Sequence, residues 1–98
     1  MRIAIDAMGG DYAPKEIVEG AILALDVIEP ADELLLVGPT QLILDCAGSK
    51  KIHNPRLHII DAPEIVGMDE SPVEALRKKR NSSLRVMTKI TADGQADA

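Results

Sequence analysis

The sequence predicts an α/β fold built on a parallel sheet. Three short apolar runs, at residues 2–6, 33–37 and 57–61, have the length of strands, and each is followed by a segment with helical spacing. Alternation of strand and helix along a chain is typical of parallel sheets with right-handed crossovers. The run at 33–37 is almost unbrokenly apolar, which suits a strand that is covered on both faces.

The first strand leads into a glycine turn and then an amphipathic helix. Gly9 and Gly10 mark the turn, and Pro14 fits the first turn of the helix that follows. Apolar residues then recur at helical spacing over residues 14–29. Pro30 ends the pattern, so we expect one helix over this whole range.

Three further helical segments are predicted in the rest of the chain. Thr40 is the expected N-cap of a short helix that stops at Gly48. Residues 71–74 (Ser-Pro-Val-Glu) form a capping box, which predicts a helix running to about Lys79. After a break, helical spacing continues over residues 84–94.

The last four residues follow a glycine that ends the final helical segment. The alternation would begin a fourth strand at this point. Three parallel strands alone leave an open edge and an uncovered face. We therefore expect residues 1–98 to be the amino-terminal portion of one larger α/β domain. The alternative is a small domain completed by another chain.

Composition excludes several classes of protein. The net charge is −5, the isoelectric point is near 4.9 and Tyr12 is the sole aromatic residue, so a nucleic-acid-binding surface is not expected. Cys46 is the single cysteine and forms no internal disulfide, which favours a reducing compartment. No apolar stretch approaches the ~20 residues of a membrane span. These features predict a cytoplasmic protein.

The turn after the first strand is one candidate binding site, because ligands of open parallel sheets collect beyond the carboxyl ends of the strands. Adjacent Gly9 and Gly10 let backbone N–H groups approach a ligand, and the following helix points its positive end there, which suits a phosphate or carboxylate. Asp6 and Asp11 would repel a bare anion, so they would orient backbone donors, pair with a base or hold a cation. A tight turn without a ligand is the alternative. The glycine spacing is not that of a dinucleotide site.

A basic segment followed by two hydroxyls is the second candidate. It consists of Arg77, Lys78, Lys79, Arg80, Ser82 and Ser83. Positive charge would attract an anion, and hydroxyls at a helix start would place it. The same bases could instead be a solvated patch at a helix end, or attract an acidic protein or anionic lipid.

Other common catalytic sites are not indicated. Neither His53 nor His58 has a second histidine or a cysteine at the spacing of zinc ligands, so we expect no metal. Cys46 follows Asp45, which disfavours a thiolate, and is expected to be a small buried side chain. A Gly-x-Ser-x-Gly elbow is absent, and nothing suggests a cofactor.

Three blocks of the sequence resemble, in residues and order, the phosphate acyltransferases of bacterial phospholipid synthesis (the PlsX family). They are Ile-Asp-Ala-Met-Gly-Gly-Asp-Tyr-Ala-Pro at 5–14, Leu-Val-Gly at 36–38, and 68–83 with its Met-Asp-Glu-Ser-Pro, Ala-Leu-Arg-Lys-Lys and paired serines. The resemblance runs along the whole chain, although 38–55 match only in outline, and family members continue well beyond residue 98.

The resemblance implies an enzyme that transfers a fatty acyl group from acyl carrier protein to inorganic phosphate. The acyl phosphate product then feeds glycerol-phosphate acylation. It also implies a three-layer α/β sandwich related to isocitrate dehydrogenase and phosphotransacetylase, usually dimeric, cytoplasmic and able to associate with the membrane surface. We expect these 98 residues alone to be inactive.

This chemistry requires phosphate held against a thioester carbonyl and no covalent nucleophile. Our interpretation gives the cradle to the amides of Gly9 and Gly10, with Asp6 and Asp11 shaping the loop. The remaining assignments are phosphate or carbonyl contacts for Lys79, Ser82 and Ser83, and attraction of the acidic carrier protein for Arg77, Lys78 and Arg80. No catalytic base is assigned. The alternatives are a non-catalytic module that recruits carrier protein or anionic membrane, and a related α/β enzyme acting on small phosphorylated or carboxylated substrates.

Overall fold

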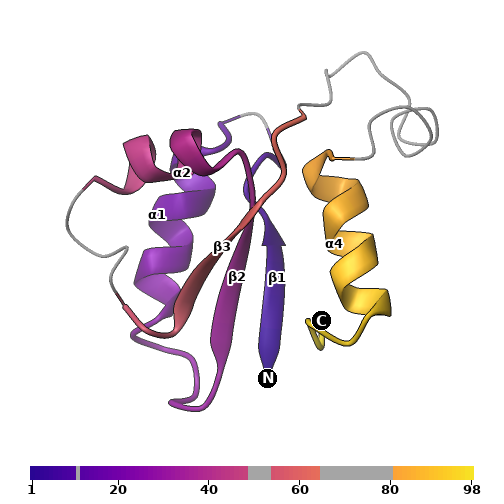
Figure 1. Cartoon of the computed structure of the whole chain (residues 1–98). Helices are drawn as coiled ribbons and strands as arrows, with labels where there is room; N and C mark the ends of the chain where they lie inside the picture. Colours follow the sequence, from indigo (N-terminus) through magenta and orange to yellow (C-terminus); the bar gives the residue numbers. More distant parts are fainter. Residues whose placement is uncertain (11, 49–53, 65–80) are drawn as a thin grey trace.

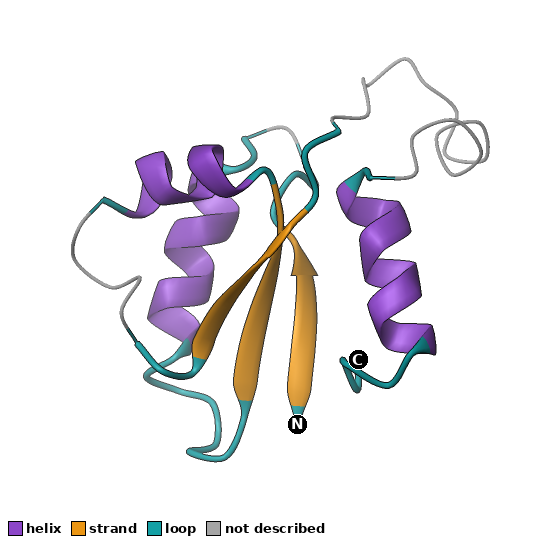
Figure 2. Cartoon of the chain, in the orientation of Figure 1, coloured by secondary structure: helices purple, strands orange, loops and turns teal. Residues whose placement is uncertain are grey.

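The computed structural model describes residues 1–10, 12–48, 54–64 and 81–98. Strands and helices alternate along these residues (Figure 2) in the order β1 (Arg2–Asp6), α1 (Lys15–Ala24), β2 (Glu33–Gly38), α2 (Thr40–Ala47), β3 (Leu57–Asp61) and α4 (Ser83–Ala92). The three strands form one parallel sheet in the order β1-β2-β3. The predicted α/β class is therefore confirmed. The predicted helix that begins at Ser71 lies outside the described residues.

The central strand β2 carries the apolar core on both of its faces. Leu34 and Leu36 belong to a cluster with residues of α1 and α2, whereas Leu35 and Val37 belong to a second cluster that includes Ile90 of α4. Side chains alternate between the faces of a strand, so an unbroken apolar run is needed where helices cover both faces. Figure 1 shows this arrangement, with α1 and α2 on one side of the sheet and α4 on the other.

The predicted helix over residues 14–29 is shorter in the structure. It begins at Lys15 and ends at Ala24, because the turn that follows is tighter: the amide of Asp26 donates to the carbonyl of Leu23 at 3.2 Å, and the amide of Val27 donates to that of Ala24 at 3.0 Å. None of the helices in the described part of the chain is long and apolar enough to cross a membrane.

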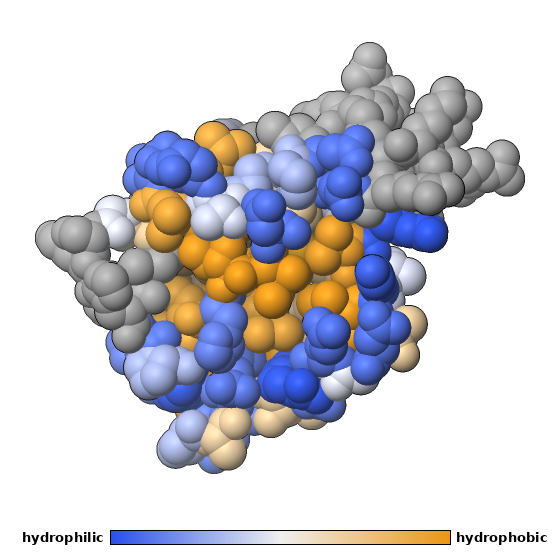
Figure 3. All heavy atoms as spheres, viewed as in Figure 1, coloured by the Kyte–Doolittle hydropathy of each residue, from blue (hydrophilic) through white to orange (hydrophobic). Residues whose placement is uncertain are grey.

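The outer strand β3 leaves an apolar area exposed. Among the described residues its strand partner is β2 alone, and the side chains of Ile59 and Ile60 are only partly buried. Figure 3 shows apolar atoms gathered at the middle of the view, between the helices on either side of the sheet.

The last residue of the chain pairs with β1 on the side away from β2. The amide of Ala98 donates to the carbonyl of Arg2 at 3.3 Å, and the amide of Ala4 donates to the carbonyl of Ala98 at 2.7 Å. This exchange is the pattern of a parallel ladder. The chain thus advances from β1 to β3 on one side of β1 and returns across α4 to the other side.

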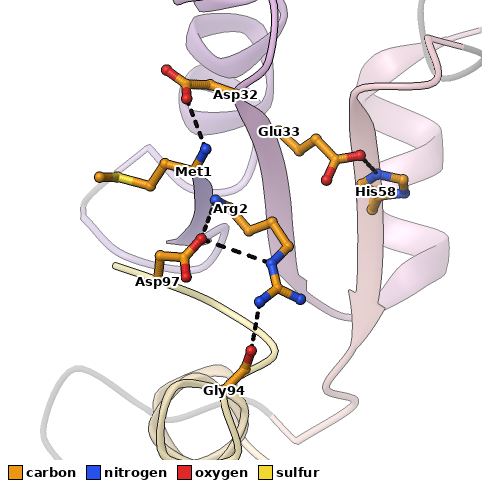
Figure 4. A network of polar contacts seen from close by, with 7 residues as sticks. All are labelled: Met1, Arg2, Asp32, Glu33, His58, Gly94 and Asp97. Carbon is orange, nitrogen blue, oxygen red and sulfur yellow. Dashed lines mark hydrogen bonds and ion pairs between the residues drawn. The ribbon is translucent and has the colours of Figure 1, made fainter.

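Polar contacts tie the chain ends together at the amino-terminal edge of the sheet (Figure 4). The ammonium group of Met1 donates to Asp32 Oδ1 at 2.9 Å. The backbone amide of Arg2 donates to Asp97 Oδ2 at 2.8 Å, and the guanidinium of Arg2 donates to the carbonyl of Gly94 at 2.6 Å. These bonds hold residues 94–98 against the start of β1.

We expect the hydrogen bond to Asp97 to make the free energy of unfolding decrease at acidic pH. The hydrogen bond from the Arg2 amide lowers the pKa of the Asp97 carboxyl in the folded state. A depressed folded pKa contributes stability above the ordinary carboxyl pKa of about 4, and that stability is lost as the pH falls through the lower folded value. Urea midpoints measured from pH 6 down to about pH 2.5 should therefore fall less steeply in Asp97→Asn than in the wild type.

Asp93→Asn is the matched control, because the Asp93 carboxylate accepts no hydrogen bond from the described residues. It should follow the wild-type acid profile. Coincident profiles for Asp97→Asn and Asp93→Asn would contradict the prediction. The Met1 ammonium behaves oppositely: its hydrogen bond to Asp32 raises its pKa, so its contribution is present below about pH 8 and disappears as the pH rises through the raised value.

Candidate functional site

The end of β1 and the start of α4 meet at the carboxyl edge of the sheet. The carboxylate of Asp6, the last residue of β1, accepts a hydrogen bond from the Ser83 hydroxyl at 2.5 Å. The same oxygen, Oδ1, accepts from the amide of Met8 at 2.9 Å. One carboxylate therefore joins the loop after β1 to the first residue of α4. The glycine turn and the serine pair, which the sequence predicts as separate candidates, therefore form one site.

Hydrogen bonds fix the first residues of the loop at 7–10, whereas its last residue has a backbone amide without a partner among the described residues. The amide of Ala7 donates to the carbonyl of Val37 at 2.9 Å, and Ala7 is fully buried. The amide of Gly9 donates to the carbonyl of Asp6 at 3.2 Å, so this predicted cradle donor already has a partner within the chain. Gly10 has a φ of 94°, and its amide bonds none of the described residues. Within residues 7–10, the Gly10 amide is thus the donor that has no acceptor among the described residues.

Gly38 at the end of β2 allows this loop to lie directly on the sheet. A Cβ atom at Gly38 would be 3.2 Å from the Ala7 side chain, 3.4 Å from Ile43 and 3.5 Å from Met8. The first contact is tighter than most real Cβ contacts, so a larger residue would push the loop away. The absence of a side chain at this position sets the height of the loop above β2.

The amino end of α4 is capped and buried. Ser82, which is fully buried, is the N-cap, and its hydroxyl oxygen accepts from the amide of Arg85 at 3.3 Å. The segment after β3 supports this turn: Glu64 forms a parallel bridge to Ser82, and its amide donates to the carbonyl of Asn81 at 3.1 Å. The amides of Ser83 and Leu84 bond none of the described residues. These two amides lie at the positive end of the helix.

The predicted site residues have different outcomes in the structure. Asp6 and Ser83 are in contact, Gly9 and Gly10 occupy the adjoining loop, and Ser82 forms the cap rather than a free hydroxyl. The others lie outside the described residues: Asp11, Arg77, Lys78, Lys79 and Arg80.

Cys46 and His58 lie away from this site, and His53 lies outside the described residues. Cys46 is partly buried and packs against the core cluster of α1 and α2. His58 of β3 is exposed, and its Nε2 lies 3.1 Å from Glu33 Oε1 at the amino-terminal part of the sheet (Figure 4). In the described part of the chain, no three histidine, cysteine or carboxylate side chains are grouped as metal ligands would be.

The capping prediction for Thr40 is wrong. Pro39 is the N-cap of α2, Thr40 is the first helical residue, and no side chain within the helix caps it. Asp61 takes over that role from the end of β3: its Oδ1 accepts from the Thr40 amide at 3.1 Å and from the Thr40 hydroxyl at 2.8 Å. The signal in the sequence was an acidic residue at the end of a strand, since Asp6 and Asp61 share that position and both bond the start of a helix.

Comparison with known proteins now defines the family. The sequence model of a family described as "Fatty acid synthesis protein" matches residues 1–98. The chain belongs to this family. It is 44% identical to the phosphate acyltransferase of Levilactobacillus brevis over 100% of its length, 43% identical to that of Desulfitobacterium hafniense over 100%, and 46% identical to that of Salinibacter ruber over 99%.

The matched part is a minority of each relative. The chain spans 27% of the Levilactobacillus protein, 28% of the Desulfitobacterium protein and 29% of the Salinibacter protein. The predicted resemblance to phosphate acyltransferases is confirmed by these relatives. The full-length relatives are proteins named phosphate acyltransferase.

Proposed function

We propose that this protein is part of an enzyme that transfers a fatty acyl group from acyl carrier protein to inorganic phosphate. The observation that carries the proposal is the meeting of the Gly10 loop and the α4 amino end at the carboxyl edge of the sheet, joined through Asp6 and Ser83. The names of the 43–46% identical relatives support phosphate as the acyl acceptor. The proposal includes a homodimer, a cytoplasmic location with contact to the membrane surface, and no cofactor.

The reaction follows from the placement of one anion. A phosphate oxygen attacks the thioester carbonyl carbon, a C–O bond forms, the C–S bond breaks, and the carrier leaves as a thiol after taking up a proton. The amides of Gly10, Ser83 and Leu84 would hold the phosphate, because they are donors that the described chain leaves without acceptors. Holding the nucleophile against the carbonyl lowers the entropic part of the barrier.

The basic residues complete the proposed site. Lys79 would contact phosphate or the thioester carbonyl, and Arg77, Lys78 and Arg80 would attract the acidic carrier protein. Asp11 would help to shape the loop together with Asp6. These assignments rest on the sequence pattern and the family resemblance.

The proposal predicts that Gly10→Ala weakens phosphate use. A φ of 94° is strained for any residue with a Cβ atom, by about 1–2 kcal/mol, so alanine would move the Gly10 amide. In the complete natural polypeptide, phosphate-dependent loss of thioester from an acylated carrier protein should continue, with the KM for phosphate raised about tenfold.

Gly20→Ala is the matched control. Gly20 lies in α1 with ordinary helical geometry, and a Cβ atom there meets nothing within 4 Å. Its KM for phosphate should stay within about twofold of the wild type. A wild-type protein that consumes the thioester at the same rate with and without phosphate would refute the proposed reaction. Carrier-protein or vesicle binding without turnover would favour the non-catalytic module.

A further inference from the structure

The contact between Asp6 and Ser83 links residues that are 77 positions apart in the sequence. Ser83 is buried, with 6% of the residue exposed, and its hydroxyl donates to Asp6 Oδ1 at 2.5 Å. Asp6 Oδ1 also accepts from the amide of Met8, so the carboxylate is anchored on two sides. Among the described residues, this is the side-chain hydrogen bond that joins the loop after β1 to α4.

The geometry decides what the Ser83 hydroxyl is able to do. A hydroxyl has one proton to donate, and that proton goes to Asp6. The Ser83 hydroxyl therefore has no proton left to donate to a phosphate oxygen, which is mainly a hydrogen-bond acceptor. A direct phosphate contact through the Ser83 hydroxyl, as the sequence suggested, would require the Asp6 bond to break and would leave a carboxylate facing the anion.

We propose that Ser83 and Asp6 are positioning residues that set the spacing between the two halves of the anion site. The Ser83–Asp6 bond holds the Gly10 loop against the amino end of α4, so that donors from both segments reach one phosphate. Ser83 contributes its backbone amide to the ligand and its hydroxyl to Asp6. This inference rests on the proposed function, since it concerns how that site binds phosphate.

The other contacts of the loop do not replace this link. The bond between the Ala7 amide and the Val37 carbonyl holds the loop to β2, and the packing on Gly38 sets its height. Neither contact involves α4. Removing the Ser83 hydroxyl would therefore leave the loop on the sheet but let it move relative to α4. An anion held by donors from both segments depends on the distance between them.

The test compares Ser83→Ala, Asp6→Ala and the double variant in the complete natural polypeptide, with inorganic phosphate and an acylated carrier protein as substrates. Each single change should raise the KM for phosphate about tenfold, the usual worth of a hydrogen bond to a charged group, and leave the KM for the carrier protein within about twofold. The double variant should be no worse than Asp6→Ala, because both changes break the same link.

Two further variants separate positioning from folding. Ser83→Cys keeps the side-chain volume but donates weakly, so it should also raise the KM for phosphate while the melting temperature stays close to the wild type. Thr91→Ala removes a hydroxyl whose hydrogen bond, among the described residues, goes to the Met87 carbonyl within α4 at 2.8 Å, and it should leave both KM values unchanged.

Three outcomes would overturn the inference: an unchanged KM for phosphate in Ser83→Ala and Ser83→Cys, equal rises in both KM values, or effects that multiply in the double variant, as expected if Ser83 contacts phosphate by itself. Failure of the proposed function gives a different result. In that case the wild type itself shows no turnover that depends on phosphate, whatever the variants do.

Discussion

Leu36→Ala is expected to lower the free energy of unfolding by about 3 kcal/mol. Leu36 is fully buried in the central strand and pairs in register with Ile5 of β1 and Ile59 of β3. It belongs to the core cluster that α1 and α2 cover, so truncation removes packed methyl groups and leaves a cavity that three strands and two helices cannot readily close. Urea denaturation measures the change as a lower midpoint with the same slope.

Leu23→Ala provides the matched control for this substitution. Leu23, on α1, is 67% exposed, so the same chemical change should alter the free energy of unfolding by less than about 0.5 kcal/mol. Equal losses for Leu36→Ala and Leu23→Ala would show that Leu36 does not lie at the centre of the packing described here.

Arg56→Lys should lower the free energy of unfolding by about 2 kcal/mol. The Arg56 guanidinium donates to three backbone carbonyls: from Nε to Asp32 at 3.0 Å, from Nη1 to Leu25 at 3.1 Å and from Nη2 to Glu29 at 2.7 Å. A lysine ammonium keeps the charge but is a single compact group that cannot span three acceptors in this fork geometry. The carbonyls after α1 would then lose their partners.

The control for this variant is Arg85→Lys on α4. The Arg85 side chain is exposed, and its guanidinium bonds none of the described residues, so its replacement should leave the urea midpoint unchanged. An unchanged urea midpoint for Arg56→Lys as well would mean that the three hydrogen bonds from the Arg56 guanidinium do not stabilise the fold.

The elements of the fold follow from local patterns in the sequence. The apolar run of β2 predicted burial on both faces, and the structure confirms it with separate clusters around Leu36 and Val37. Local patterns misplaced the end of α1, because its apolar spacing continues to Ile28 while the carbonyls of Leu25 and Glu29 turn toward Arg56. Periodicity reports which side chains face the core, and it contains no information about a side chain that arrives from another segment.

Local patterns also predicted only part of the candidate site. Sequence alone identified Asp6, Gly10 and the paired serines, since glycines at a turn and hydroxyls at a helix start have local geometric causes. It did not assign each donor to its acceptor.

Only the tertiary structure decided that the Ser83 hydroxyl bonds the Asp6 carboxylate. The physical reason is distance along the chain: a hydrogen bond between residues 77 positions apart forms only after the sheet and α4 have packed. Residue type sets what a group is able to donate or accept, and packing sets which partner it meets.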